Sequence, residues 1–375
     1  MSWQLLSSTT APPAGPKEMR PPMVVCQPAG RQKFHSSRNM DSWILLTLLL
    51  SSYFCHAIFA CPHLCTCFFS TNTTQVVCSE PSLTHFPSVG LPANTTLLSV
   101  EFTNLSSISA HDLEATPLLQ ELHLSDNLLS SLPENLLKGL THLHTLDLTR
   151  NQLEHLPPRV FHHAPLQNLV LRENLLHTAV AEWLPPNSNI TTLNLAGNRL
   201  GTIPTALLQN LPRLNVLDLR QNHLEKITAD SLNALSDLEM LHLEENKLSY
   251  IDPLAFQHTT KLTHLFLQDN QLHKVPPGLF QGLHRLEVLT LNNNKLRSLP
   301  YGLLEKIRSR GASNNQRVDL SMNPWECKAE VAYLWKWMRA NRESVFFPLD
   351  VQCWGPEPLK GRPVLSLTEE EIKTK

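Results

Sequence analysis

Histidine offers the most chemistry in this sequence, because imidazole can act as a general base or bind a metal ion. The chain has 18 histidines. None lies in an H-E-x-x-H motif, and the chain also lacks a G-x-S-x-G motif and a phosphate-binding glycine loop. His162 and His163 are adjacent, but no further ligand follows at metal spacing. The sequence therefore provides no catalytic candidate, and we expect neither an enzyme nor a resident cofactor.

Cysteine is the second residue type with chemistry to offer. Two of the eight cysteines precede residue 60, and six follow: Cys61, Cys65, Cys67, Cys78, Cys327 and Cys353. The first four have the spacing C-x3-C-x-C-x10-C, which suits either a zinc site or two disulfides. An even number of cysteines in an exported chain favours disulfides. We expect Cys327 to pair with Cys353.

The longest apolar run, "WILLTLLLSSYF" at 43–54, indicates export. It is too short to span a bilayer, and the small residues Ala57 and Ala60 follow it, as in a secretory signal. A membrane anchor is the alternative. We treat 1–60 as a leader and expect a secreted, extracellular protein without a membrane span. The formal charge of -2 gives no support for nucleic-acid binding.

A repeated pattern dominates the rest of the chain. The stretch "LQELHLSDNLLSSLP" at 119–133 returns with small changes, in the form L-x-x-L-x-L-x-x-N-x-L. Eight asparagines mark the copies at intervals of 24 residues, with one interval of 23: Asn127, Asn151, Asn174, Asn198, Asn222, Asn246, Asn270 and Asn294. A final one, Asn323, follows in "VDLSMNPWEC". This period and this pattern are the leucine-rich-repeat signature.

The pattern predicts an α/β solenoid with a horseshoe shape. Each x-L-x-L-x core alternates, so it should form a short strand with its leucines inward. The strands should form a parallel concave sheet, and the rest of each unit should return as short helix or turn. We expect each asparagine to bond backbone groups that burial would leave unpaired, a structural role.

Both ends of such a stack need a cap, because terminal repeats expose an apolar side. We predict an amino-terminal cysteine cap at 61–96, repeats at 97–323, a carboxy-terminal cysteine cap at 324–363 and a charged tail at 364–375. The first repeat is degenerate, and Leu105 is interpreted as standing where its asparagine should be. In the second cap, 328–342 should be helical with one apolar face: Val331, Leu334, Trp335 and Met338.

The alternation also predicts which side chains face outward on the concave sheet. Four apolar residues fall on consecutive strands at outward positions: Val216, Met240, Phe266 and Val288. A contiguous exposed apolar patch often marks an interaction site. Arg220 and Glu244 lie on adjacent strands and should pair. His242 and His264 also lie on neighbouring strands, where a solvated surface is favoured over a two-histidine metal site.

Four N-x-S/T sequons are present, at Asn72, Asn94, Asn104 and Asn189. In a secreted chain these are candidate glycan sites. Three lie in the amino-terminal quarter, so glycans there would leave the carboxy-terminal half more accessible to partners.

Several stretches are similar to one family beyond the repeat consensus. "VEFTNL", "LQELHLS", "LDLTRNQLEHLPP", "LRENLL", "LHLEENKL", "SMNPWEC" and "GPEPLKG" together resemble the leucine-rich alpha-2-glycoprotein family, over about 95–363. The family's amino-terminal cap has fewer cysteines than the four found here. In similar caps the first cysteine pairs with the third and the second with the fourth, which implies Cys61–Cys67 and Cys65–Cys78. The sequence itself leaves this pairing open.

The resemblance implies a non-catalytic, secreted plasma glycoprotein. Such a protein would act as an accessory ligand in transforming growth factor β signalling, through receptor complexes that include endoglin, and would promote angiogenesis. Cytochrome c is a further partner that the family implies. Two alternatives share the architecture: a carrier subunit of a plasma complex, and a collagen-binding matrix protein. The chain lacks the acidic, sulfated-tyrosine or serine-glycine leader that such matrix proteins often carry.

Overall fold

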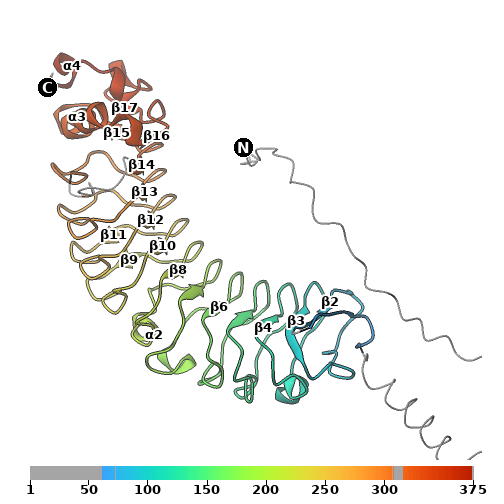
Figure 1. The fold of residues 1–375 in the computed structure, drawn as a ribbon. Coiled ribbons are helices and arrows are strands. Elements are labelled where there is room, and N and C mark those ends of the chain that lie inside the picture. Colours follow the sequence, from blue (N-terminus) through green and yellow to red (C-terminus); the bar gives the residue numbers. More distant parts are fainter. Residues whose placement is uncertain (1–60, 72, 306, 308–315, 374–375) are drawn as a thin grey trace, which may run out of the picture. The chain divides into compact units, whose positions relative to one another are not determined.

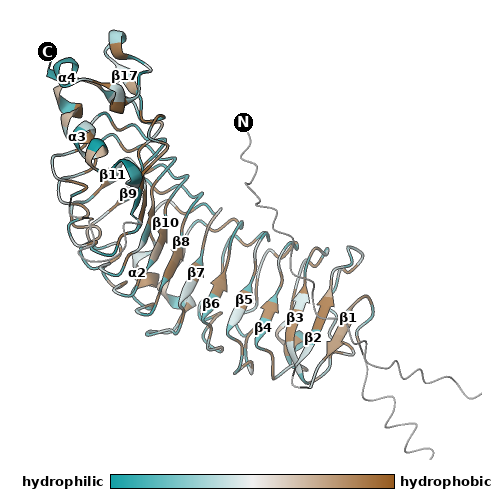
Figure 2. Ribbon diagram, turned by 45° about the horizontal axis from the view of Figure 1, so that its top comes forward, coloured by the Kyte–Doolittle hydropathy of each residue, from teal (hydrophilic) through white to brown (hydrophobic). Residues whose placement is uncertain are grey.

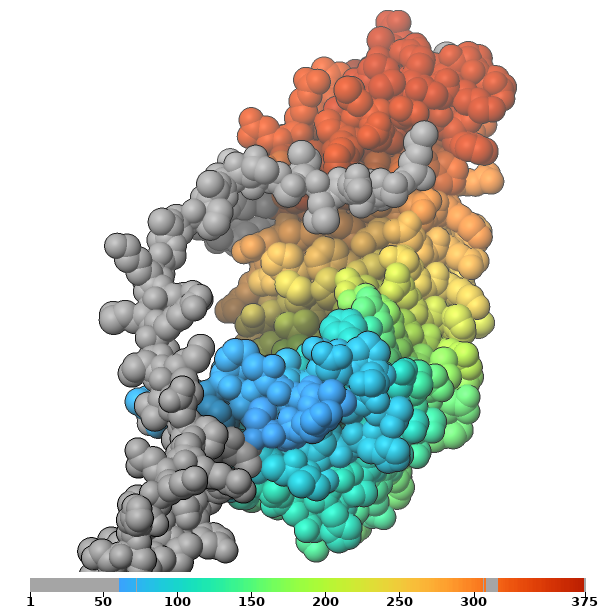
Figure 3. Space-filling view, turned by 90° about the vertical axis from the view of Figure 1, so that its right-hand side faces the viewer, coloured from blue at the N-terminus to red at the C-terminus, as the bar shows by residue number. Residues whose placement is uncertain are grey.

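The computed structural model describes residues 61–71, 73–305, 307 and 316–373. These residues form a curved solenoid with a 13-stranded sheet along one side (Figure 1). Every turn of the chain adds one strand, so the turns follow one another as stacked bands from the amino-terminal to the carboxy-terminal end (Figure 3). The predicted leader, with its apolar run at 43–54, lies outside the described residues.

The repeats supply ten parallel strands of this sheet. They are β3 (Thr95–Val100), β4 (Glu121–His123), β5 (Thr145–Asp147), β6 (Asn168–Val170), β7 (Thr192–Asn194), β8 (Val216–Asp218), β10 (Met240–His242), β12 (His264–Phe266), β13 (Val288–Thr290) and β14 (Arg317–Asp319). From β4 to β13 the pairing keeps one register, with a leucine opposite a leucine at the centre of each strand. The predicted horseshoe with a parallel sheet is confirmed.

The return segments hold little regular structure. They contain the 3₁₀ turns η1 (Ala110–Leu113) and η2 (Ala181–Trp183), the helix α2 (Thr205–Leu208), and a small ladder of β9 (Lys226–Ile227) with β11 (Tyr250–Ile251). Between them and the sheet lies an aliphatic core of inward-facing leucines. In Figure 2, β8 and β10 are largely brown, because each carries such a leucine beside a second apolar residue.

The repeat asparagines satisfy buried backbone groups at the end of each strand. The Nδ2 of Asn222 donates to the carbonyls of Leu219 and Arg220 in its own turn, each at 3.1 Å. It also donates to the Leu195 carbonyl of the preceding turn at 2.9 Å, while its Oδ1 accepts from Leu200 N at 3.0 Å. The other eight donate in the same way, and all of them except Asn127 accept from a backbone N–H of the preceding turn: Asn127, Asn151, Asn174, Asn198, Asn246, Asn270, Asn294 and Asn323. We call this series the asparagine ladder.

A left-handed residue precedes every member of the ladder, a feature that the sequence pattern did not reveal. The residue before Asn222, Gln221, has φ of 54°, and its equivalents from Asp126 to Met322 have similar values. Residues other than glycine rarely adopt this backbone conformation. Only at Gly197 is the position a glycine, and there a Cβ would lie 2.9 Å from Cγ of Glu173.

The first repeat corrects one expectation from the sequence. Leu105 was placed at the asparagine position, but the pairing of Leu98 with Leu122 puts Thr103 opposite Asn127. The Thr103 hydroxyl donates to Asn127 Oδ1 at 2.5 Å and accepts from Leu105 N at 3.3 Å. Leu105 is fully buried as a core residue. Threonine therefore takes over part of the asparagine's role at this end of the ladder.

The amino-terminal cap is a hairpin that extends the sheet. β1 (Thr66–Phe69) pairs antiparallel with β2 (Thr74–Cys78), and β2 pairs parallel with β3. Disulfides join Cys61 to Cys67 and Cys65 to Cys78, as in similar caps. Cys78 is fully buried against the first repeat, so the second disulfide ties the hairpin to the core.

The carboxy-terminal cap closes the other end around the Cys327–Cys353 disulfide. Its strands are β15 (Trp325–Glu326), β16 (Val345–Phe346) and β17 (Cys353–Gly355), and its helical elements are η3 (Ala329–Val331), α3 (Ala332–Ala340), η4 (Arg342–Ser344), η5 (Glu357–Leu359), η6 (Val364–Ser366) and α4 (Glu369–Lys373). β16 pairs with β14, which continues the sheet into the cap. The predicted apolar face of 328–342 is buried, and Tyr333 and Trp337 are buried as well.

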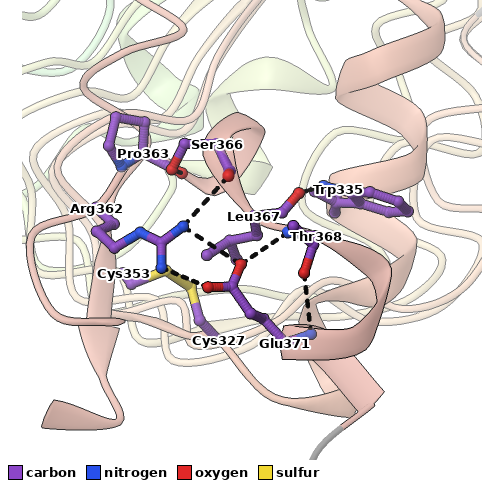
Figure 4. The surroundings of a disulfide bond; sticks show 9 residues. All are labelled: Cys327, Trp335, Cys353, Arg362, Pro363, Ser366, Leu367, Thr368 and Glu371. Carbon is purple, nitrogen blue, oxygen red and sulfur yellow. Dashed lines mark hydrogen bonds and ion pairs between the residues drawn. A yellow bond between two sulfur atoms is a disulfide. The ribbon is translucent and has the colours of Figure 1, made fainter. Parts of the chain in front are cut away.

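The segment expected to be a charged tail from residue 364 is folded into this cap. Val364, Leu367 and Ile372 are buried, and the indole of Trp335 donates to the Leu367 carbonyl at 3.0 Å. Beside the disulfide, Arg362 pairs with Glu371 at 2.6 Å (Figure 4). The carboxylate of Glu371 also accepts from the backbone N–H of Thr368, a capping arrangement that starts α4. The predicted boundary between cap and tail at residue 363 was therefore wrong, because buried apolar residues lie among charged residues in this segment.

Asn222→Ala is expected to lower the free energy of unfolding by about 1–3 kcal/mol, since three buried carbonyls and one amide lose a partner. Asn233→Ala is the matched control, because Asn233 is exposed and donates to the Asp230 carboxylate. Denaturant unfolding followed by circular dichroism would measure both. Equal midpoints for the two variants would contradict the role assigned to the ladder.

Acid should loosen the segment 364–373. The pKa of Glu371 in this segment is lowered from 4.5 to about 2. The largest cause is the hydrogen bond from Arg362, and the second is the hydrogen bond from the Thr368 backbone N–H. A lowered pKa means that the carboxylate stabilises the docked segment at neutral pH, and that this contribution fades as the pH falls from about 4.5 towards 2. At neutral pH, Glu371→Gln should therefore increase hydrogen exchange in 364–373. Glu369→Gln, in the same helix but in an exposed pair with Lys373, should change it less.

Candidate protein-binding face

The concave face carries a row of apolar and aromatic side chains across four adjacent strands. Val216, Met240, His264 and Val288 lie opposite one another in register on β8, β10, β12 and β13. All four are half-buried rather than exposed. Adjacent strands lie about 4.8 Å apart, so neighbouring side chains cover one another. The expected patch is therefore contiguous but less exposed than the alternation suggested.

Phe266 lies in the next outward position and is packed between two histidines. Its ring stacks on His242, with ring centroids 4.4 Å apart and an angle of 13° between the planes. The ring of His264 lies 6.2 Å away at 30°. Phe266 is half-buried, so one side of this aromatic group remains open to solvent. We call Val216, Met240, His264, Phe266 and Val288 the apolar row.

A charged cluster adjoins the apolar row. Nη1 of Arg220 lies 3.7 Å from Oε1 of Glu244, which is the predicted pair, and its Nε lies 3.4 Å from Oδ2 of Asp218. Nδ1 of His242 lies 3.0 Å from the same Oε1 of Glu244. Asp218 and Glu244 are both buried. The pairing of Arg220 with Asp218 was not anticipated, because the two lie on one strand and its extension.

Burial raises the pKa of Asp218 above its ordinary value of 3.8, and the nearby Arg220 guanidinium and backbone N–H offset part of this effect. Burial disfavours the charged form of a carboxyl group. Burial therefore disfavours the charged form of Asp218, and the contacts with Arg220 partly compensate for this.

Asp218 belongs to a set of strand residues whose side chains bond back to the backbone of their own turn. Its Oδ1 accepts from the backbone N–H two residues later, at 3.2 Å. Asp147, Asn194 and Asp319 make the same bond at 2.8–3.0 Å. These residues close the turn after the strand, as Asx side chains commonly do. An Asp or Asn at the centre of "L-x-L" is the sequence signal that could have predicted this hydrogen bond.

The histidines form no metal centre in the part of the chain that the structure describes, where no group of three or more His, Cys, Asp or Glu side chains could hold an ion. His242 and His264 instead flank Phe266. His123, at the other end of the sheet, lies 3.3 Å from Glu121.

Three of the sequons lie on exposed asparagines: Asn94, Asn104 and Asn189. Asn94 and Asn189 occupy equivalent positions in the repeat, three residues before Leu97 and Thr192, which the strand register aligns. Asn104 Nδ2 donates to the Pro81 carbonyl at 2.7 Å. Asn72 lies outside the described residues. No sequon falls between β8 and β13, so the apolar row has no glycan site on its own strands.

Asp218→Asn should change the pH dependence of stability. Because burial raises the folded-state pKa of Asp218, the contribution of Asp218 to stability falls as the pH rises above 3.8. Asparagine does not titrate, and Asn194 shows that it can make the same backbone hydrogen bond. The variant should therefore gain stability relative to the native protein as the pH rises from 3.8 through the raised folded-state pKa of Asp218. Parallel stability profiles over this range, measured by denaturant unfolding, would contradict this prediction.

Comparisons with known proteins agree with this architecture. A family model described as "Leucine rich repeat" matches residues 93–153, 117–176, 164–224, 212–272 and 260–309. A chain in the solved octameric complex of Latrophilin 3, Unc5D and FLRT2, where FLRT2 is marked as the repeat component, is 25% identical with a TM-score of 0.67. The match covers 83% of this chain and 99% of that one.

Curated relatives match shorter stretches. A phospholipase A2 inhibitor of Gloydius brevicaudus siniticus is 48% identical over 68 residues, 18% of this chain and 20% of the inhibitor. Human opticin is 36% identical over 110 residues, 29% of this chain and 31% of opticin. The match thus spans only about a fifth to a third of these relatives' lengths. The family matches together cover 93–309, more than half of the chain, and the chain therefore belongs to the leucine-rich-repeat family.

Proposed function

We propose that this protein is a secreted, non-catalytic glycoprotein that binds protein partners through the apolar row on its concave face. The observation that carries the proposal is the contiguity of that row across four strands, at positions where polar side chains would serve solubility better. As a leucine-rich-repeat protein, the chain is a protein-binding module. In this proposal, the apolar row on the concave face is the place where the protein partner binds.

An extracellular setting is supported by the three disulfides, which form and persist in oxidising compartments. The exposed sequons at Asn94, Asn104 and Asn189 would be accessible for glycosylation there. Among the described residues, no helix is both long and apolar enough to cross a membrane. The apolar run at 43–54 would direct the export of the chain.

For the partner, we propose the transforming growth factor β receptor complex that includes endoglin, with an effect on angiogenesis. This follows the resemblance of "SMNPWEC", "GPEPLKG" and the repeat stretches to the leucine-rich alpha-2-glycoprotein family. Cytochrome c is a further partner proposed on the same ground.

A second candidate is a role as the inhibitory or carrier subunit of a complex with an extracellular enzyme. The similarity to a protein named phospholipase A2 inhibitor favours it over the collagen-binding matrix alternative. Both candidates use the same kind of surface and differ in partner. A stable complex of fixed stoichiometry in plasma would favour the second.

Met240→Glu combined with Phe266→Glu should weaken binding to immobilised endoglin and type II receptor ectodomains by about tenfold or more, because a charge would be buried in the apolar row. Leu254→Glu is the matched control, since Leu254 is an exposed leucine on a return segment, away from the sheet. Surface plasmon resonance would measure all three proteins. Undiminished binding by a folded double variant would remove the row from the interface, and absent binding by the native protein would favour the second candidate.

A further inference from the structure

The charged cluster beside the apolar row contains a buried carboxylate oxygen without a partner. The side chain of Glu244 is 7% exposed. Its Oε1 lies near both His242 and Arg220, at 3.0 and 3.7 Å. Its Oε2 is buried and has no hydrogen-bonding partner among the described residues. Buried polar atoms are nearly always hydrogen-bonded in native proteins, so this oxygen points to a group supplied from outside the chain.

The charges around Glu244 favour a cation. Asp218 and Glu244 carry two negative charges, and Arg220 supplies one positive charge that the two share. Arg220 is further engaged through its backbone N–H, which donates to Asp218 at 3.2 Å. Counted without His242, the three charged residues Asp218, Arg220 and Glu244 have a formal net charge of -1.

The surroundings of this oxygen favour a long side chain with an apolar stem. From Met240 to Glu244 the chain covers about 13 Å, at about 3.3 Å per residue, and the ring of Phe266 packs on His242 between them. A partner main chain over Val216 and Met240 would need a long side chain to reach Glu244. A single unpaired oxygen suits the compact ammonium of lysine better than the two-pronged guanidinium of arginine.

We propose that Glu244 receives the ammonium group of a lysine from the protein partner, whose aliphatic stem lies across Phe266. The inference rests on the proposed use of the concave face for protein binding and specifies what that face recognises. The apolar row provides contact area, and the buried carboxylate selects for a positive charge at one end of it. Apolar surface alone would accept many partners, whereas a desolvated unpaired charge penalises any partner without a cation there.

Methionine methyl groups offer a direct readout in the whole secreted protein. Residues 61–375 contain three methionines. Met240 lies in the apolar row, Met322 is exposed near the second cap, and Met338 is fully buried. In protein labelled with 13C-methyl methionine, Met240 would be assigned with a Met240→Leu variant. The probes are Nα-acetyl-lysine methylamide and its norleucine counterpart, which keeps the stem and lacks the ammonium.

The lysine probe should shift the Met240 signal in a saturable way, and the norleucine probe should bind at least about tenfold more weakly. Glu244→Gln, which keeps the shape of the side chain, should weaken lysine binding by a similar factor. The neighbouring Glu245→Gln is the control, because Glu245 is exposed and paired with Gln221 at 2.9 Å. An unchanged Met338 signal would show that each variant remains folded.

Equal responses to the two probes, or no response to lysine, would overturn the inference, and the comparison on the native protein decides this even where a variant fails to fold. Receptor binding that is lost in the Met240→Glu, Phe266→Glu protein but unchanged in Glu244→Gln would also overturn it, while leaving the proposed function standing. Selective lysine binding in a protein that binds neither receptor ectodomain would support the inference and reject those partners.

Discussion

The structure depends on satisfying backbone groups where each strand ends. At that point the chain turns into the next return segment, and its carbonyls are buried between two turns of the solenoid. Each ladder asparagine donates to carbonyls of its own turn and of the preceding turn, and all except Asn127 accept from a backbone amide of the preceding turn. One side chain therefore closes its own turn and attaches it to the turn before. The near-constant interval between the asparagines follows from this requirement, because every turn must return to the same bonding position.

The regular stacking has a direct effect on the concave face. Because strands repeat in register, each outward position becomes a column of side chains that cover one another. Polar groups that look exposed along a single strand are buried by the adjacent ones, as with Asp218 and Glu244. The same stacking places Phe266 against His242 and lines up Val216, Met240, His264 and Val288. The chemistry of this face is thus a property of columns rather than of single repeats.

Much of this fold could be predicted from the sequence, because the repeat pattern determines which residues form strands and which side chains face the core. The spacing of the asparagines and the alternation of the leucines predicted the strands, their order and the outward columns. Thr103 was missed because a hydroxyl can replace an amide at the end of the ladder, where fewer partners need to be bonded. The burial of 364–373 was missed because Leu367 and Ile372 are too few to form a periodic pattern. The arrangement around Glu244 depends on three adjacent turns, and no single stretch of sequence contains it.

The closed ends have a consequence for the persistence of the protein outside the cell. A solenoid joined only between neighbouring turns can fray from its termini, where the last turn has one neighbour instead of two. Here Cys65–Cys78 fastens the first turn and Cys327–Cys353 fastens the last, with the segment 364–373 folded over it. The caps thus oppose fraying at the ends, and opening in the interior requires ladder contacts with two neighbouring turns to break together. We therefore expect proteases that act on frayed ends to cleave the repeat array slowly, so that its lifetime outside the cell depends on how rarely its turns open.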